Sequence, residues 1–198
     1  MKKNLFIIAL MTFILSACGN KSQTTDNDLK IDQVATPSSD LISSVTPSPK
    51  NTESAEYAAI TTKDGQIVVK LYSKEAPKTV ANFLKKANSG FYNNLTFHRV
   101  IADFMAQGGD PTGTGTGGNR QKSELNTIPF KRGSLGLART AETKEYSNDS
   151  QFFICFTDNG CQHLTGDYVN FGEVISGFDV LDKIKQGDKI IQLSSKTK

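Results

Sequence analysis

The sequence predicts a mainly β protein, a closed antiparallel β-barrel or sandwich with two isolated helices plugging its ends. Three observations lead to this fold class. Short apolar runs divided by glycine turns fill much of the chain after residue 57, and two stretches there show helical spacing. The composition, with 16 glycines, 12 phenylalanines and no tryptophan, suits a turn-rich β protein. Many short strands with few helices are typical of barrels and sandwiches.

Residues 1–17 are predicted to be a lipoprotein signal peptide. Lys2 and Lys3 precede an apolar run from Leu5 to Leu15. That run is shorter than the roughly 20 apolar residues that span a bilayer, but it suits a secretory signal. Small residues directly before Cys18 resemble the bacterial lipobox, in which the cysteine is lipidated. An ordinary secretory signal with an incidental cysteine is the alternative.

Residues 18–56 are predicted to be the lipidated cysteine and a flexible tether. Ser, Thr, Asn, Asp and Pro dominate this segment, and its apolar residues are isolated. Such a composition buries too little apolar surface to offset the entropy of ordering. The expected location is therefore extracytoplasmic, lipid-anchored to a bacterial membrane. Gly19 lacks an acidic retention signal, so the outer and the cytoplasmic membrane both remain open.

The foldable part, residues 57–198, begins with a predicted β-hairpin. Two β-rich runs within residues 56–72 flank Asp64-Gly65, a strong hairpin signal. Residues 76–91 read as a helix, because Pro77 suits its first turn and apolar residues recur at helical spacing up to Gly90.

The later elements are short strands and one further helix. Strands are predicted within residues 134–138, 150–156 and 168–175. A second helical pattern covers 178–187, with acids early and lysines late, as the helix dipole prefers. Residues 188–193 would form a closing strand.

Composition and motifs exclude several classes of function. The formal charge of +3 is spread out, which is too little for a nucleic-acid surface. Gly113, Gly115 and Gly118 formally match a dinucleotide fingerprint, but a polar segment interrupted by Pro129 follows where a helix is required. Two histidines and the later cysteines show no recognised metal-ligand spacing. No cofactor or metal is therefore expected.

Cys155 and Cys161 leave two alternatives open. They lie six residues apart in a protein predicted to be outside the cytoplasm, where disulfides are permitted. Cys155, however, falls in a predicted buried strand, and buried free cysteine is common. The free form is favoured.

Six segments resemble the cyclophilins in order, and the resemblance covers residues 57–193. They are FHRVIADFMAQGGD, GTGTGG, LGLAR, SQFFIC, HLTGDYVNFGEV and FDVLDKI. Cyclophilins are peptidyl-prolyl cis/trans isomerases. The resemblance implies a closed eight-stranded antiparallel β-barrel capped by two α-helices.

The resemblance also implies the site. Arg99 matches the catalytic arginine, although a structural ion pair would be its simplest role without the motifs around it. Gln107 matches the amide that holds the substrate backbone. His98 is expected to be a hydrogen-bonded structural histidine. The other substrate-binding residues carried over are Phe104, Met105, Gly115, Ala138, Arg139, Thr140, Gln151, Phe153, His163, Leu164 and Tyr168.

Two positions depart from the family pattern. His163 stands where many members have a tryptophan, and Tyr168 where many have a histidine. In the family that tryptophan contacts cyclosporin, so weaker cyclosporin binding is expected here.

The predicted function is peptidyl-prolyl cis/trans isomerisation in secreted or envelope proteins during folding. Arg99 would stabilise the twisted amide electrostatically. The partners are proline-containing segments and the membrane, and the chain is expected to act as a monomer. The rival hypothesis is a membrane-tethered proline-segment binding module or chaperone with weak catalysis.

Overall fold

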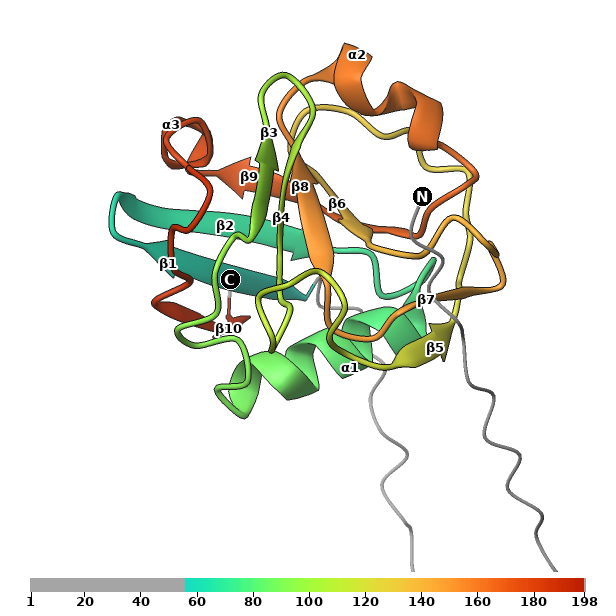
Figure 1. The fold of residues 1–198 in the computed structure, drawn as a ribbon, viewed down its shortest axis with the longest axis horizontal. Helices are drawn as coiled ribbons and strands as arrows, with labels where there is room; N and C mark the ends of the chain where they lie inside the picture. Colours follow the sequence, from blue (N-terminus) through green and yellow to red (C-terminus); the bar gives the residue numbers. More distant parts are fainter. Residues whose placement is uncertain (1–55, 198) are drawn as a thin grey trace, which may run out of the picture. The chain divides into compact units, whose positions relative to one another are not determined.

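Eight antiparallel strands form one curled sheet in the computed structural model, which describes residues 56–197 (Figure 1). The strand order is β10-β1-β2-β9-β6-β8-β4-β3. The predicted signal peptide, Cys18 and nearly all of the tether lie outside the described residues. The strands are β1 (Tyr57–Thr62), β2 (Gly65–Leu71), β3 (Arg99–Ile101), β4 (Met105–Gly108), β6 (Ser134–Leu137), β8 (Phe152–Cys155), β9 (Asn170–Ser176) and β10 (Gln192–Lys196). A separate two-stranded ribbon pairs β5 (Arg120–Lys122) with β7 (Tyr146–Asn148).

The first hairpin is confirmed. Strands β1 and β2 pair from Tyr57 opposite Lys70 to Thr62 opposite Gly65. Gly65 adopts a φ of 134°, a conformation that side-chain-bearing residues rarely adopt, which explains the glycine after Asp64. The closing strand is displaced: it starts at Gln192 rather than at residue 188.

The prediction of a closed barrel is wrong, because the sheet is open between β3 and β10. The two edges approach at an isolated bridge between Thr96 and Lys189. Antiparallel register through that bridge places β3 opposite residues 184–186, which form the turn after the last helix instead of a strand. Strand β10 lies on the other side of the bridge. Within residues 56–197, no strand is therefore available to pair with β3 on its outer edge.

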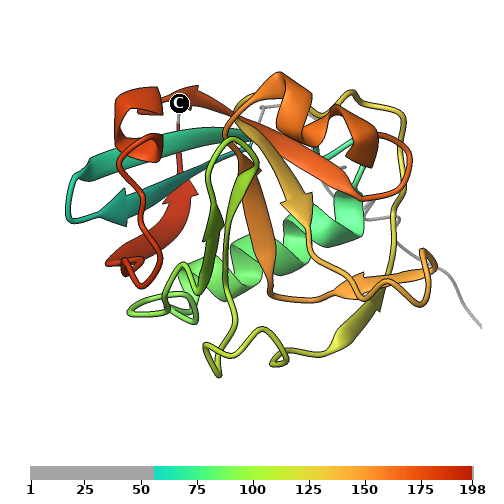
Figure 2. The ribbon, with the colours of Figure 1, turned by 45° about the horizontal axis from the view of Figure 1, so that its top comes forward.

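Helix α1 (Pro77–Asn88) is confirmed, with proline in its first turn and Val80, Phe83 and Ala87 buried. It crosses one end of the curled sheet, and the shorter helices lie at the other end (Figure 2). The carboxylate of Glu124 accepts hydrogen bonds from the backbone N–H groups of Lys78 and Thr79, which the helix itself leaves without partners.

The prediction of two capping helices is wrong in detail. The second predicted helix is reduced to α3 (Phe178–Leu181), because the chain tightens beyond it into hydrogen bonds from Lys183 to Val180 and from Ile184 to Leu181. The helical turns α2 (Asp158–Cys161) and η1 (Gln162–Leu164) were not predicted. Among residues 56–197, no helix is long and apolar enough to cross a membrane.

The sheet buries apolar side chains on both of its faces. In β8, Phe152 and Ile154 point into the main core, together with α1. Phe153 and Cys155 point the other way, into a second cluster with Met105, Phe130, Cys161 and Leu164. Successive residues of a strand face opposite sides, so one strand serves both clusters. This second cluster carries the candidate site.

Cys155 and Cys161 form a disulfide, which corrects the preference for free buried cysteines. Their Cα atoms lie 6.2 Å apart, and both residues are fully buried in the second cluster. The unpredicted α2 turn brings Cys161 back over the end of β8. The bridge could not be anticipated because its geometry depends on that turn.

Replacing both cysteines with alanine should lower the free energy of unfolding by about 2 kcal/mol, since the bridge restrains a short loop in the unfolded chain. Urea unfolding with and without reductant measures the loss. The reductant should lower the wild-type midpoint and leave the double variant unchanged. A wild-type midpoint indifferent to reductant would contradict the disulfide's role.

Candidate active site

Three neighbouring strands align the central residues of the site. Arg99 in β3 pairs with Gln107 in β4, and Gln107 pairs with Phe153 in β8. Met105 lies two residues before Gln107, so both face the same side of the sheet as Phe153. Sheet register therefore brings a cation, an amide and two apolar side chains together on the outer face.

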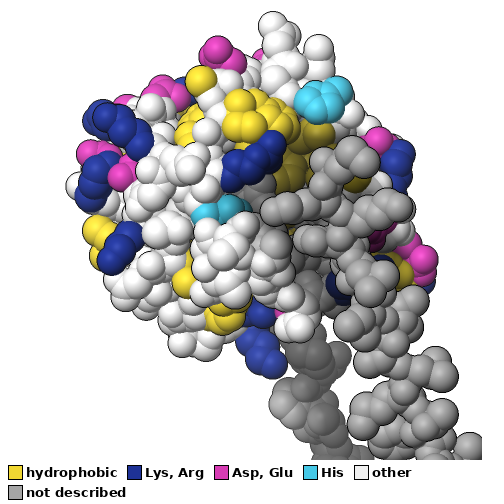
Figure 3. All heavy atoms as spheres, in the orientation of Figure 1, with side chains coloured by type: hydrophobic (Ala, Val, Ile, Leu, Met, Phe, Trp, Pro, Cys, Tyr) yellow, Lys and Arg dark blue, Asp and Glu magenta, His cyan; other side chains and the backbone are white. Residues whose placement is uncertain are grey.

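An apolar cavity of about 190 Å³ lies on this face. A patch of hydrophobic side chains with basic and histidine side chains beside it is visible in Figure 3. All ten residues that line the cavity were predicted as site residues from the sequence: Arg99, Phe104, Met105, Gln107, Ala138, Arg139, Phe153, His163, Leu164 and Tyr168.

The aromatic ring of Phe153 is held from two sides. Phe130 stacks on it with ring centroids 5.6 Å apart, and Tyr168 meets it edge-on at 5.8 Å. Gly136 lies opposite Phe153 in β6, where a Cβ atom would come within 2.2 Å of the ring. Phe130 and Gly136 were missed by the sequence reasoning. The glycine in SLGLAR was the available signal, since a glycine within a strand often marks a close approach.

Arg99 and two amides form a hydrogen-bonded row along the rim. Arg99 Nη1 donates to Gln107 Oε1 at 3.2 Å, and Gln107 Nε2 donates to Gln151 Oε1 at 2.9 Å. Gln151 Nε2 donates to the carbonyl oxygens of Gly115 and Gly117 at 3.1 and 2.8 Å. Arg99 has no carboxylate partner among the salt bridges of the described residues.

A second cavity of about 240 Å³ adjoins the first and shares Gln107, Ala138 and Arg139 with it. The remaining predicted residues, Gly115, Thr140 and Gln151, line this second cavity. All predicted site residues within the described chain are thus brought together. Arg120, whose guanidinium lies 4.5 Å from the ring centroid of Tyr146, also lines it and was not predicted.

The Arg139 side chain lines the apolar cavity and is held in place by other groups of the domain. Its Nε donates to the Asp167 carbonyl at 3.0 Å, and its Nη1 donates to the Thr140 carbonyl at 2.9 Å. Its guanidinium lies 4.3 Å from the ring centroid of Tyr168, within the range of a cation–π contact. Arg139 and Tyr168 therefore support each other beside the apolar cavity.

His163 lies on the opposite wall, in η1, and is exposed. Its ring is tilted against Phe104, with the centroids 5.7 Å apart. The departure from tryptophan thus keeps an aromatic contact with Phe104, but the smaller imidazole covers less apolar surface.

His98 was expected to be hydrogen-bonded. No well-formed hydrogen bond reaches its buried ring nitrogens among the described residues, but the backbone of Thr96 lies close enough to raise the pKa of the ring. The ring lies beneath the glycine loop, with Nε2 about 3.8 Å from the position of a Cβ atom at Gly115. Burial lowers the pKa of His98, which favours the neutral ring at physiological pH.

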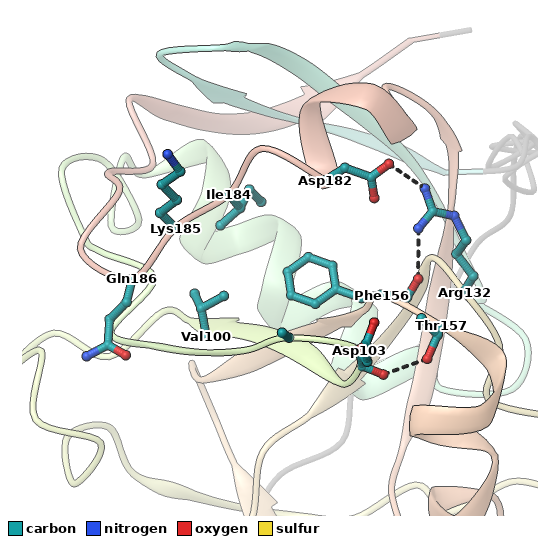
Figure 4. Close-up of a pocket in the computed structure, with 10 residues that line it drawn as sticks. Val100, Asp103, Arg132, Phe156, Thr157, Asp182, Ile184, Lys185 and Gln186 are labelled. Atoms are coloured by element: carbon teal, nitrogen blue, oxygen red, sulfur yellow. Dashed lines mark hydrogen bonds and ion pairs between the residues drawn. The ribbon is translucent and has the colours of Figure 1, made fainter.

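A third cavity, of about 470 Å³, lies elsewhere and shares no lining residue with the other two (Figure 4). It lies at the open edge of the sheet beside β3, where Val100 faces the turn that contains Ile184. Its Arg132 is already bonded to Asp182 and to the Phe156 carbonyl. This lining contains none of the predicted residues. Among residues 56–197, no group of three or more His, Cys, Asp or Glu side chains could hold a metal ion.

The relatives of the chain define its class as a peptidyl-prolyl cis-trans isomerase. An enzyme of that name from Helicobacter pylori is 50% identical over 140 residues, which cover 68% of this chain and 83% of that protein. Another, from Synechococcus elongatus, is 40% identical over 140 residues, covering 69% and 93%.

The family follows from two further comparisons. The family model described as "Cyclophilin type peptidyl-prolyl cis-trans isomerase/CLD" matches residues 57–196. A crystal structure of a cyclophilin-type isomerase from Cryptosporidium parvum has a TM-score of 0.68 and 32% identity, covering 73% of this chain and 99% of that one. The chain belongs to the cyclophilin-type peptidyl-prolyl cis-trans isomerases.

Gly136→Ala should lower the free energy of unfolding by about 1–3 kcal/mol, because the new methyl group overlaps the Phe153 ring. Urea denaturation measures the change. In a background that already carries Phe153→Leu, the same substitution should cost less, since the closer of the two overlapping rings has gone and only Phe130 remains. Equal losses in the two backgrounds would show that the ring is not what excludes a side chain at 136.

Proposed function

We propose that the domain accelerates cis/trans exchange at X-Pro bonds of extracytoplasmic proteins during folding, and that Arg99 stabilises the twisted amide. The observation that carries this proposal is the position of Arg99. Its guanidinium lines a small apolar cavity and is oriented by an amide rather than neutralised by a carboxylate.

The reaction itself calls for little more than such an arrangement. Partial double-bond character sets a rotation barrier of about 18–20 kcal/mol, and no covalent bond needs to break. Twisting removes conjugation and returns a lone pair to the prolyl nitrogen. A fixed cation that hydrogen-bonds there favours the twisted state over both planar states. Arginine suits this task because its planar fork stays charged.

The apolar cavity supplies a grip on the proline ring. Met105, Phe153 and Leu164 are buried beneath it, and Phe104 is half-buried at its edge. The Cryptosporidium parvum protein was also crystallised in the presence of the dipeptide Ala-Pro, at 32% identity and a TM-score of 0.65 to this chain. That likeness supports proline-containing peptides as substrates here.

The flanking chain would be held by Gln107 and by the segment after β6. The N–H of Ala138 donates to the Gln151 carbonyl, and its own carbonyl accepts from Asn148 N–H. Both backbone groups of Ala138 are thus used within the domain, so pairing with a peptide would fall to Arg139 and Thr140. His163 presents an exposed imidazole at the other wall, which underlies the proposed weaker binding of cyclosporin.

Arg99→Ala should lower kcat/KM by about 10²–10³, the usual effect of removing one preorganised donor from a transition state. The side chain is exposed, so stability should change little. Protease-coupled or NMR exchange assays on an X-Pro peptide measure the rate.

Arg99→Lys is the matched control, because it keeps the charge but loses the planar fork. Its activity should fall between those of the wild type and the alanine variant. Full activity of Arg99→Ala would rule out this role for Arg99. An isolated domain with barely measurable activity would favour the binding-module hypothesis instead.

The proposed location rests on the first 18 residues of the sequence. A short apolar run ends at Leu15-Ser16-Ala17-Cys18, the pattern of a lipidated cysteine. Multiple acyl chains, at about 0.8 kcal/mol per buried methylene, would anchor the chain firmly. The disulfide between Cys155 and Cys161 is compatible with an oxidising compartment.

Metabolic labelling with a radioactive fatty acid should mark the full chain, and Cys18→Ser should abolish the label, since its thiol is the acceptor. Cys161→Ser serves as the matched control and should stay labelled. Label that persists in Cys18→Ser would reject the lipid anchor.

A further inference from the structure

Asp110 is a buried carboxylate at the start of the glycine loop and has no role in the site described so far. It is 1% exposed. Its Oδ1 accepts from the backbone N–H and the hydroxyl of Thr112, both at 2.8 Å. Its Oδ2 accepts from the backbone N–H of Gly115. The loop therefore wraps around one carboxylate.

The loop leaves almost no room around this carboxylate. A Cβ atom at residue 117 would come within 2.1 Å of Asp110 Oδ1, so Gly117 is required there. Burial raises the pKa of Asp110, but the hydrogen bonds from Thr112, Gly115 and Gly117 outweigh it and hold the pKa below its usual value. The ionised acid, which can only accept hydrogen bonds, is the form that suits these donors.

The same loop presents its carbonyl groups to Gln151. The carbonyl oxygens of Gly115 and Gly117 both accept from Gln151 Nε2, and Asn148 Nδ2 also donates to Gly117 at 2.9 Å. Two acceptors on one side oblige the Gln151 amide to turn its nitrogen towards the loop. Its oxygen must then face Gln107.

The orientation of the Gln151 amide determines that of Gln107, and Gln107 in turn orients Arg99. Gln107 meets the Gln151 oxygen and so must present its own nitrogen there. Its oxygen is left to accept from Arg99 Nη1. If either amide were flipped, two donors or two acceptors would face each other, and each mismatch would lose a hydrogen bond.

We propose that Asp110 is a positioning residue for the isomerase reaction, acting on Arg99 through the Gly115–Gly117 loop, Gln151 and Gln107. The proposal rests on the proposed role of Arg99 in the reaction. Asp110 is not among the residues that line the apolar cavity. Its effect is to fix the loop carbonyls that select the orientation of both amides.

The test substitution is Asp110→Asn in the full chain. Both carboxylate oxygens of Asp110 accept hydrogen bonds from the loop. Asparagine replaces one of these oxygens with an NH2 group, which would face an N–H donor of the loop, so the loop must shift. We expect kcat to fall by about tenfold or more, because small displacements of a catalytic group have large effects on rate. KM should change less. Thr112→Val, which removes one donor to Asp110, should produce a smaller loss in the same direction and remains informative where Asp110→Asn folds poorly.

Glu124→Gln is the matched control. Glu124 is also a carboxylate that accepts two backbone N–H groups, but it does so at the start of α1. It should lose stability without a loss of kcat. A double-mutant cycle on kcat separates this role from a purely structural one. If Asp110 acts through Arg99, Asp110→Asn should lower kcat little further in an Arg99→Ala background.

The side-chain amide signals of Gln107 and Gln151 in NMR spectra separate this proposal from the proposed function. They should shift in Asp110→Asn and not in Glu124→Gln, whatever the activity of the chain. Unshifted amide signals in a folded Asp110→Asn variant would overturn the proposal, as would a loss of kcat that adds in full to that of Arg99→Ala. Full activity of Arg99→Ala with shifted amide signals would reject the role of Arg99 while leaving the hydrogen-bonded row intact.

Discussion

The site depends on a row of hydrogen bonds in which each acceptor determines the direction of the next donor. The row begins at the buried Asp110 carboxylate and ends at the exposed guanidinium of Arg99. Between them, the loop carbonyls and two glutamine amides admit one orientation each. A flexible arginine beside an apolar cavity would lose much of its value for catalysis, because its favourable orientation would have to be selected anew in each turnover. The row supplies that orientation in the folded state.

The apolar half of the site depends on a sheet that is covered on both faces. Strand β8 sends Phe152 and Ile154 into the main core and Phe153 and Cys155 into the second cluster. Gly136 leaves room for the Phe153 ring, and the disulfide ties the end of β8 to the α2 turn that precedes the pocket wall. The main core and the apolar cavity thus share one strand.

Sequence patterns were sufficient where the determinants are local. Asp64-Gly65 marked the first hairpin and Pro77 marked α1, and both elements form as expected. The residues that line the apolar cavity were identified by the resemblance of four motifs to the cyclophilins, not by local patterning. Local patterns could not show the open edge between β3 and β10, because it depends on register between segments far apart in the chain. The disulfide was missed because it depends on the α2 turn, whose four residues are too few to show helical spacing. Asp110 was passed over for a different reason: its partners are nearby backbone N–H groups, and no residue type marks a loop that folds back on one carboxylate.

The most direct test of the account is neutron diffraction from deuterium-exchanged crystals of the protein, which locates the side-chain deuterium atoms of Gln107 and Gln151. The account predicts that Gln151 donates to the carbonyl oxygens of Gly115 and Gly117, that Gln107 donates to Gln151, and that Asp110 carries no deuterium. Deuterium on Gln107 pointing towards Arg99, or a protonated Asp110, would contradict it.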